Sequence, residues 1–126
     1  MELAHVALLV DDYDEAISWL KRCLDFVLVE DTPTEGKRWI TMRPAGGGCS
    51  LVLAQAANTR QRIAVGNQFG GRVGLFLHTQ DFAKAEQQLR RNEVRIIREP
   101  ADQTHGRVLV FQDMWGNLWD LIAPKN

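Results

Sequence analysis

The stretch from Ala7 to Arg22, ALLVDDYDEAISWLKR, decides the fold because a second stretch, from Phe76 to Arg91, repeats its pattern as FLHTQDFAKAEQQLRR. A shift of 69 positions (81 minus 12) places Asp12 on Asp81 and aligns the two stretches without a gap. The same shift also pairs Leu20 with Leu89, Tyr13 with Phe82, Arg38 with Arg107, and Gly47 with Gly116. Two copies are too few for a solenoid, so the repeat predicts a domain made of two related modules.

Each copy shows one order of elements. An apolar strand (about residues 3–10 and 73–79) precedes a helix, which Asp12 caps in the first copy and Asp81 or Thr79 in the second. In the first helix, Ala16, Trp19, Leu20 and Cys23 share one face. Three strands then follow in each copy: FVLVED, RWITMRP and SLVLAQ, then VRIIREP, GRVLVFQD and NLWDLIAP.

The predicted fold class is α+β, with two tandem βαβββ modules that form a pseudo-twofold half-barrel around a central cavity. We expect one domain over residues 1–126. The first module covers about 1–54, a linker with one short helix about 55–71, and the second module about 72–126. Such a cavity is a typical place for a small-molecule site.

Composition and charge exclude several classes of partner. A net charge of -1 and a pI near 6.3 give no basic surface for nucleic acid or for an anionic membrane. The two cysteines, Cys23 and Cys49, fit neither a disulfide framework nor a zinc spacing. The apolar run HVALLV is too short to cross a bilayer, and MELAH lacks the basic start of a signal peptide. We therefore expect a cytoplasmic protein without a nucleic-acid or membrane partner.

Two polar residues interrupt apolar strands. His5 lies in the first strand of the first copy, and Asp120 lies in the last strand of the second copy. A half-barrel would bring these two positions to one concave surface, where an imidazole and a carboxylate can bind a divalent metal. The alternatives are a His–Asp hydrogen bond without metal, a core histidine, or a salt bridge from Asp120 to Arg38 or Arg107.

The opening HVALLVDDYDEAISWL and the ending GRVLVFQDMWGNLWDLIAP resemble the vicinal oxygen chelate superfamily. This group contains glyoxalase I, extradiol dioxygenases, fosfomycin-modifying enzymes and bleomycin-resistance proteins. The resemblance spans essentially the whole chain. Its most specific element is the ending D-x-x-G-N-x-x-[ED]-L, here Asp113 to Leu121.

The resemblance implies a metal site built from the first and last strands of each copy. His5 matches one ligand position, and Asp120 stands where Glu is usual. The other two positions fall on Gly74 and on Leu51, or on Ser50 after a slip of one residue, and none of these is a good ligand. His78 lies on the same strand face as Gly74 but about 13 Å along it, so it does not replace the missing ligand.

Five further residues are candidates for substrate binding. His105 borders the expected cavity mouth, although solvent exposure explains it equally well. His78 fits a strand-end histidine near the following helix cap better than it fits a site residue. Arg38 and Arg107 could bind an anionic group bidentately or could pair with nearby acids. Trp39, like Trp115 and Trp119, is either a ring-stacking residue or a core or dimer-interface aromatic.

Two functions follow from the resemblance. The first is a lyase or dioxygenase in which His5 and Asp120 hold Ni, Mn, Fe or Zn as a Lewis acid, or in which Asp120 acts as a base. The second is a metal-free protein that sequesters a small molecule, as bleomycin-resistance proteins do. The retained His5 and Asp120 favour the enzyme, and the two missing ligands favour the binding protein. The resemblance also implies a homodimer.

Overall fold

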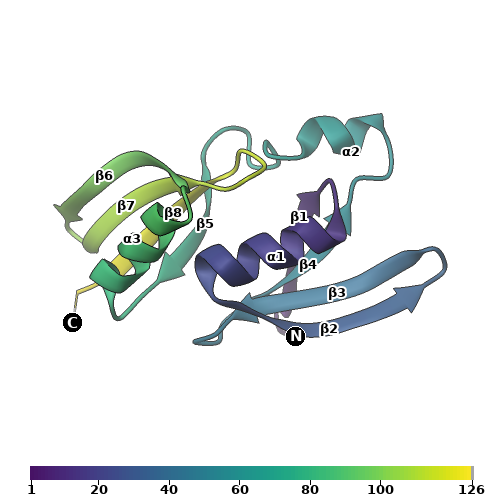
Figure 1. The fold of residues 1–126 in the computed structure, drawn as a ribbon, viewed down its shortest axis with the longest axis horizontal. Helices are drawn as coiled ribbons and strands as arrows, with labels where there is room; N and C mark the ends of the chain where they lie inside the picture. Colours follow the sequence, from purple (N-terminus) through teal and green to yellow (C-terminus); the bar gives the residue numbers. More distant parts are fainter. Residues whose placement is uncertain (126) are drawn as a thin grey trace. The chain divides into compact units, whose positions relative to one another are not determined.

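A computed structural model describes residues 1–125, which fall into two compact units, Met1–Val65 and the part that begins at Gly66. The first unit contains β1 (His5–Val10), α1 (Tyr13–Leu24), β2 (Phe26–Thr34), β3 (Lys37–Pro44), β4 (Ser50–Gln55) and the short α2 (Thr59–Ala64) (Figure 1). Its four strands form sheet A in the order β1-β4-β3-β2. The β1–β4 pair is parallel, and the other two pairs are antiparallel.

The second unit repeats this topology. It contains β5 (Val73–His78), α3 (Phe82–Arg91), β6 (Arg95–Gln103), β7 (Gly106–Gln112) and β8 (Leu118–Pro124). These strands form sheet B in the order β5-β8-β7-β6, again with one parallel pair, between β5 and β8. The predictions of an α+β fold and of two βαβββ modules are confirmed. Within residues 1–125, no helix is long and apolar enough to cross a membrane.

The two helices α1 and α3 begin where the sequence predicts. Asp12 accepts a hydrogen bond from the backbone N–H of Glu15 at 2.9 Å, and Asp81 accepts one from Lys84 at 3.1 Å. These caps satisfy backbone donors that have no partner inside the helix. Thr79 also contributes, because its hydroxyl accepts from the backbone N–H of Asp81. Of the two alternatives for the second cap, Asp81 is therefore the residue that caps α3, and Thr79 binds the backbone N–H of that cap residue.

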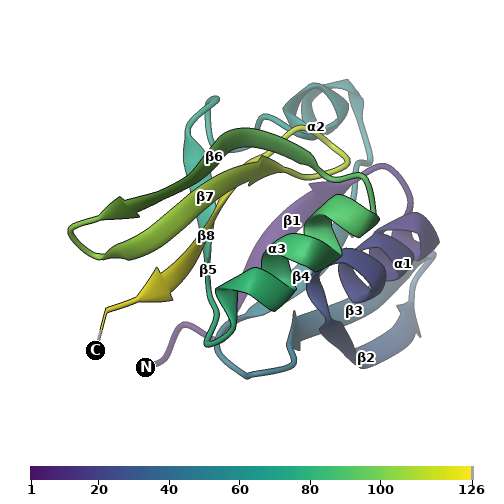
Figure 2. The ribbon, with the colours of Figure 1, turned by 60° about the vertical axis from the view of Figure 1, so that its left-hand side comes forward.

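The helices cover one face of each sheet and bury its apolar residues. In sheet A, this covered face has α1 packed against it and buries alternate strand residues: Leu8, Val10, Ile40, Met42, Leu51 and Leu53. In sheet B, α3 packs on the face that carries Leu109, Phe111, Trp119 and Leu121. Figures 1 and 2 show each helix lying along its own sheet. Period-2 alternation therefore leaves a second face, called here the open face, on each sheet.

The Asp113 carboxylate organises the turn between β7 and β8. One of its oxygens accepts from the backbone N–H groups of Trp115, Gly116 and Asn117 at 2.9–3.0 Å. The other accepts from the Asn117 side chain at 3.0 Å and from Trp119 Nε1 at 2.8 Å. The Asp and Asn of the chain's D-x-x-G-N ending thus serve the fold, because they fix the start of β8 and the buried indole of Trp119.

Candidate functional site

The open face of sheet A holds a cluster of His5, Trp39 and Glu30. The ring of His5 meets that of Trp39 edge to face, with centroids 5.9 Å apart. Trp39 is 39% exposed, and its Nε1 donates to Glu30 Oε1 at 2.8 Å. The structure therefore brings together two residues that the sequence singled out, His5 and Trp39, and adds an acid that sequence reasoning missed.

The open face of sheet B carries a row of four residues on four strands. The register pairs Phe76 with Asp120, Asp120 with Val110, and Val110 with Arg98. Val110 is buried, whereas Phe76 is 56% exposed and so is a large apolar side chain at the surface. The row thus combines an aromatic ring, a carboxylate, an aliphatic side chain and a guanidinium.

Asp120 is the electrostatically perturbed residue of this row. Partial burial raises the pKa of its carboxyl above the ordinary Asp value, and the positive charges of His105 and Arg98 oppose that rise. His105 lies in the tight connection between β6 and β7, and His78 lies on β5 beside Ile122 of β8. Three predicted site residues, Asp120, His78 and His105, therefore lie on strands of sheet B or in the turn between β6 and β7, and a fourth, Arg107, lies on β7.

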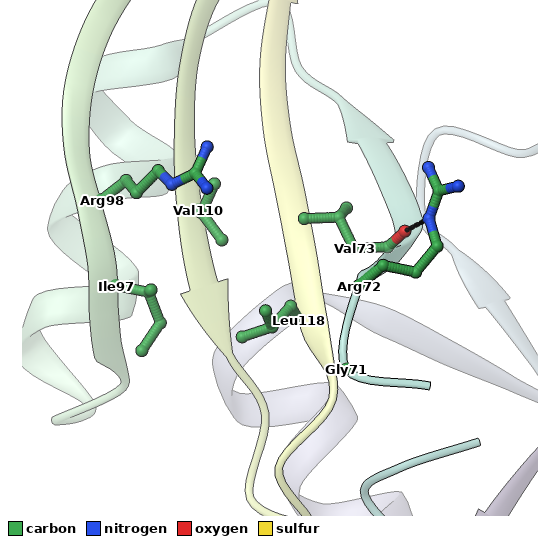
Figure 3. A pocket seen from close by; sticks show the side chains of 7 residues that line it. All are labelled: Gly71, Arg72, Val73, Ile97, Arg98, Val110 and Leu118. Carbon is green, nitrogen blue, oxygen red and sulfur yellow. Dashed lines mark hydrogen bonds between the residues drawn. The ribbon is translucent and has the colours of Figure 1, made fainter. Parts of the chain in front are cut away.

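A hollow of about 330 Å³ opens on this face of sheet B. Its lining is mostly aliphatic, with one guanidinium group from β6 and one from the residue directly before β5. The lining residues are Gly71, Arg72, Val73, Ile97, Arg98, Val110 and Leu118. Figure 3 shows Arg98 extending from β6 toward β7 near Val110, and Val73 pointing toward β8 (Figure 3). The volume is within the range of small-molecule sites, and an apolar lining with few polar groups is typical of them.

Arg38 and Arg107 lie on the covered faces. Arg38 makes two hydrogen bonds to Asp31, at 3.2 and 2.7 Å, and an ion pair with Asp14 at 3.0 Å. Its guanidinium also lies over the ring of Tyr13 in α1. Arg107 pairs with Asp102 at 3.2 Å and lies over the Phe82 ring of α3. Both arginines therefore tie a hairpin to a helix, and substrate binding by them stays a prediction.

The residues present do not fit the four-position metal site that the resemblance implies. At position 74 a side chain would overlap the ring of Phe69, because a Cβ built on Gly74 lies closer to three atoms of that ring than a non-bonded contact allows. In β4, the offset position Leu51 is buried on the covered face, and Ser50, opposite His5, offers only a hydroxyl. Within residues 1–65 and within residues 66–125, no three His, Cys, Asp or Glu side chains are grouped as metal ligands.

The register corrects the repeat at this point. Val52 pairs with Ala7 of β1 and with Thr41 of β3. Asp120 pairs with Phe76 and Val110, and a shift of 69 places Ala7 on Phe76 and Thr41 on Val110. Val52, at an offset of 68 (120 minus 52), is therefore the structural counterpart of Asp120. Val52 has no atom that can bind a metal.

Sequence reasoning missed Glu30, Phe69, Phe76 and Arg98. Arg98 has no clear signal, because the irregular strand pairing on either side of it is not visible in the sequence. Phe76 had a usable signal, since it is an aromatic residue two positions before His78 on the same face. Glu30 also had a usable signal, since it is an acidic residue on the strand that comes directly before the strand of Trp39.

Comparison with known proteins gives consistent matches. A model of the Glyoxalase/Bleomycin resistance protein/Dioxygenase superfamily matches residues 2–121. An uncharacterized protein of Shewanella frigidimarina (strain NCIMB 400) is 45% identical over 123 residues, which are 95% of this chain and 91% of that protein.

Solved structures match over nearly their whole length. The crystal structure of UcmS2 has a TM-score of 0.82 and 25% identity, over 97% of each chain. TnmS3, an antibiotic binding protein from Streptomyces sp. CB03234, has a TM-score of 0.79 and 26% identity, over 99% of this chain and 97% of that one.

Proposed function

Because the chain belongs to the glyoxalase/bleomycin resistance protein/dioxygenase superfamily, we propose that it binds a small organic molecule in the hollow of sheet B and does so without a metal. The observation that carries the proposal is the apolar hollow of about 330 Å³ formed by Val73, Val110 and Leu118. The filling of the position-74 space by Phe69 supports the metal-free part. TnmS3, a structural neighbour, is an antibiotic binding protein, which supports binding as the activity.

The hollow is suited to a ligand with an apolar body. Burial of apolar ligand surface against the aliphatic lining supplies the driving force, about 25 cal/mol per Å². Val73 and Leu118 are half-buried, so their exposed parts remain available to a ligand.

The test is a fluorescence titration with N-phenyl-naphthylamine, an uncharged apolar probe. The native protein should bind one probe per chain, and Val73→Trp should abolish that binding because the indole fills the hollow. Val29→Trp is the matched control, because Val29 is 53% exposed on β2 of the other sheet. Retained binding in Val73→Trp, or equal loss in both variants, would contradict the proposal.

A second candidate function is acid–base catalysis by Asp120, favoured by its raised pKa. A carboxylate of increased basicity on an apolar face can take a proton next to a carbonyl group of a bound molecule. In this reading, Asp120→Asn binds ligand as the native protein does but no longer exchanges the ligand's acidic C–H with deuterium. Unchanged exchange in the variant would exclude the catalytic role.

Metal-assisted lyase or dioxygenase chemistry is the less supported reading. Calorimetric titration of dialysed protein with Ni, Mn, Fe(II) and Zn, repeated with His5→Ala, tests it. Tight one-to-one binding that is lost in the variant would support His5 as a metal ligand. A homodimer and a cytoplasmic location stay predictions. Light scattering on the purified protein tests the first, and fractionation of cells tests the second.

A further inference from the structure

Three arginines on the strands and helix of the second unit, Arg91, Arg95 and Arg98, form no ion pair among residues 66–125, and of these three Arg98 is the one that lines the hollow. Arg107 pairs with Asp102, and Arg90 pairs with both Glu86 and Glu99. Arg98 takes part in no ion pair among the described residues, although it lies on the open face of sheet B in one row with Asp120. A guanidinium beside an apolar hollow with no carboxylate in contact is available to an external anion.

A second guanidinium lies at the other side of the hollow. Arg72 donates from Nε to the backbone carbonyl of Val73 at 3.1 Å, and its terminal nitrogens make no hydrogen bond within residues 1–125. Figure 3 shows Arg72 beyond Val73, on the side of the hollow away from Arg98. A planar guanidinium can bind a carboxylate, sulfonate or phosphate with two parallel hydrogen bonds.

The charge around the hollow favours an anion. Two guanidinium groups, Arg72 and Arg98, line the hollow, and one carboxylate, Asp120, lies in the same row as Arg98, so these three groups together carry a charge of +1. Arg95 pairs with Gln112, two residues from Val110 along β7, so it lies on the same face and adds a further positive charge, and His78 and His105 lie on or beside this face as well. Sheet A shows the opposite arrangement, since Glu30 occupies in its row the place that Arg98 has in sheet B.

We propose that the ligand of this hollow has an apolar body and an acidic group, and that Arg98 is the specificity-determining residue that binds the acidic group. This inference rests on the function proposed above. The aliphatic lining binds the body, and the guanidinium on the rim orients the ligand, so a neutral analogue of the same shape enters the hollow but binds less tightly.

Two probes with one ring system test the inference. Anilinonaphthalene sulfonate carries a sulfonate, and N-phenyl-naphthylamine is the same molecule without it. We expect Arg98→Ala to weaken the sulfonate probe about tenfold, as loss of a charge-assisted hydrogen bond does, and to change the neutral probe less than about twofold. Arg98→Lys, which keeps the charge but loses the planar fork, should retain part of the affinity.

The control is Arg60→Ala, which removes the same charge from an exposed position in α2. It should leave both probes within about twofold, because Arg60 is exposed and is not part of the lining of the hollow. Amide chemical shifts of Val73, Val110 and Leu118 should move when either probe binds. Equal effects of Arg98→Ala on the two probes, or no effect on either, would overturn the inference while leaving the proposed function intact. Failure of both probes to bind the native protein would instead contradict the proposed function.

Discussion

The covered faces of the two modules are alike, and their open faces are unlike. On the covered side, Asp12 and Asp81 cap the two helices, and Arg38 and Arg107 lie over the aromatic rings of Tyr13 and Phe82. On the open side, one row of four paired residues in sheet A corresponds to one row in sheet B, but the side chains differ. The row in sheet A is Ala7, Val52, Thr41 and Glu30, and the row in sheet B is Phe76, Asp120, Val110 and Arg98.

This difference separates residues that make the fold from residues that make the site. Packing of a helix on a sheet requires the same caps and the same apolar alternation in both modules, so the repeat persists on the covered side. The open faces carry no such shared requirement. Ionisable and aromatic groups on them, such as Asp120, Arg98 and Phe76, are therefore the candidates for function.

The largest expected effect on stability is at the β7–β8 turn, which Asp113 organises. The first module has no counterpart of this residue, because the shift of 69 places Pro44 on Asp113. Asp113→Ala removes five hydrogen bonds and leaves buried donors of Asn117 and Trp119 without an acceptor. We expect the free energy of unfolding in urea to fall by about 3 kcal/mol or more. Asp102→Ala, which removes an exposed carboxylate, should change it far less, and a similar loss in both variants would contradict this role.

The next effect is at Gly74, the position that the repeat pairs with His5. Gly74→Ala should destabilise the protein by about 1–3 kcal/mol, because the new methyl group overlaps the ring of Phe69. In a double-mutant cycle, the Phe69→Ala background should remove most of that penalty. Additive losses would show that Phe69 does not fill the space beside Gly74.

A smaller effect distinguishes Asp120 from Val52, its structural counterpart. The pKa of Asp120 is raised because the folded state disfavours the charged carboxyl. The folded protein therefore loses stability as the pH rises from below the ordinary Asp pKa of about 3.9 through the raised pKa of Asp120. Asp120→Asn should therefore have a higher Tm at pH 7, with the difference vanishing below about pH 4. Asp11→Asn, at an exposed site, is the control, and a lower Tm for Asp120→Asn at neutral pH would contradict the account.

The smallest effect compares the two arginines of the covered faces. Arg38→Ala should lower the Tm more than Arg107→Ala, because Arg38 has two acidic partners and Arg107 has one. The hydrogen bonds from Arg38 lower the pKa of Asp31, so their contribution is present above the ordinary Asp pKa and is lost as the pH falls through the lowered value. The Tm difference between Arg38→Ala and the native protein should therefore shrink in acid. If Arg107→Ala lowered the Tm as much as Arg38→Ala or more, the number of acidic partners would not determine how much each arginine stabilises the protein.

Residues on the covered faces could be predicted from the sequence because they obey simple periodicities. The i, i+3, i+4 spacing of Ala16, Trp19 and Leu20 predicted the buried face of α1, and all three are buried. The caps at Asp12 and Asp81 follow from side-chain oxygens placed just before the helices. The offset of 69 holds without a gap from β1 through α1, so the helix start in the first module also predicts the helix start in the second.

Residues on the open face of sheet B could not be predicted as well. The pairing of β6 with β7 shifts between Ile96 and Arg98 and again between Arg98 and Ala101, so counting residues does not give the row in which Arg98 lies. The sequence shift places Leu51 on Asp120, whereas the strand register gives Val52 as its counterpart. The cause is similar, because a slip of one residue moves a side chain to the other face of the sheet. The ring of Phe69 fills the space at Gly74 from a loop, whose path no periodicity describes.

The most direct measurement of the central claim is the titration of N-phenyl-naphthylamine into metal-stripped protein that contains excess EDTA. Metal-free binding in the hollow predicts one saturable site per chain, with the same affinity in EDTA, after addition of Mn or Ni, and in His5→Ala, and with no binding in Val73→Trp. Binding that disappears in EDTA and returns with a divalent metal would contradict it.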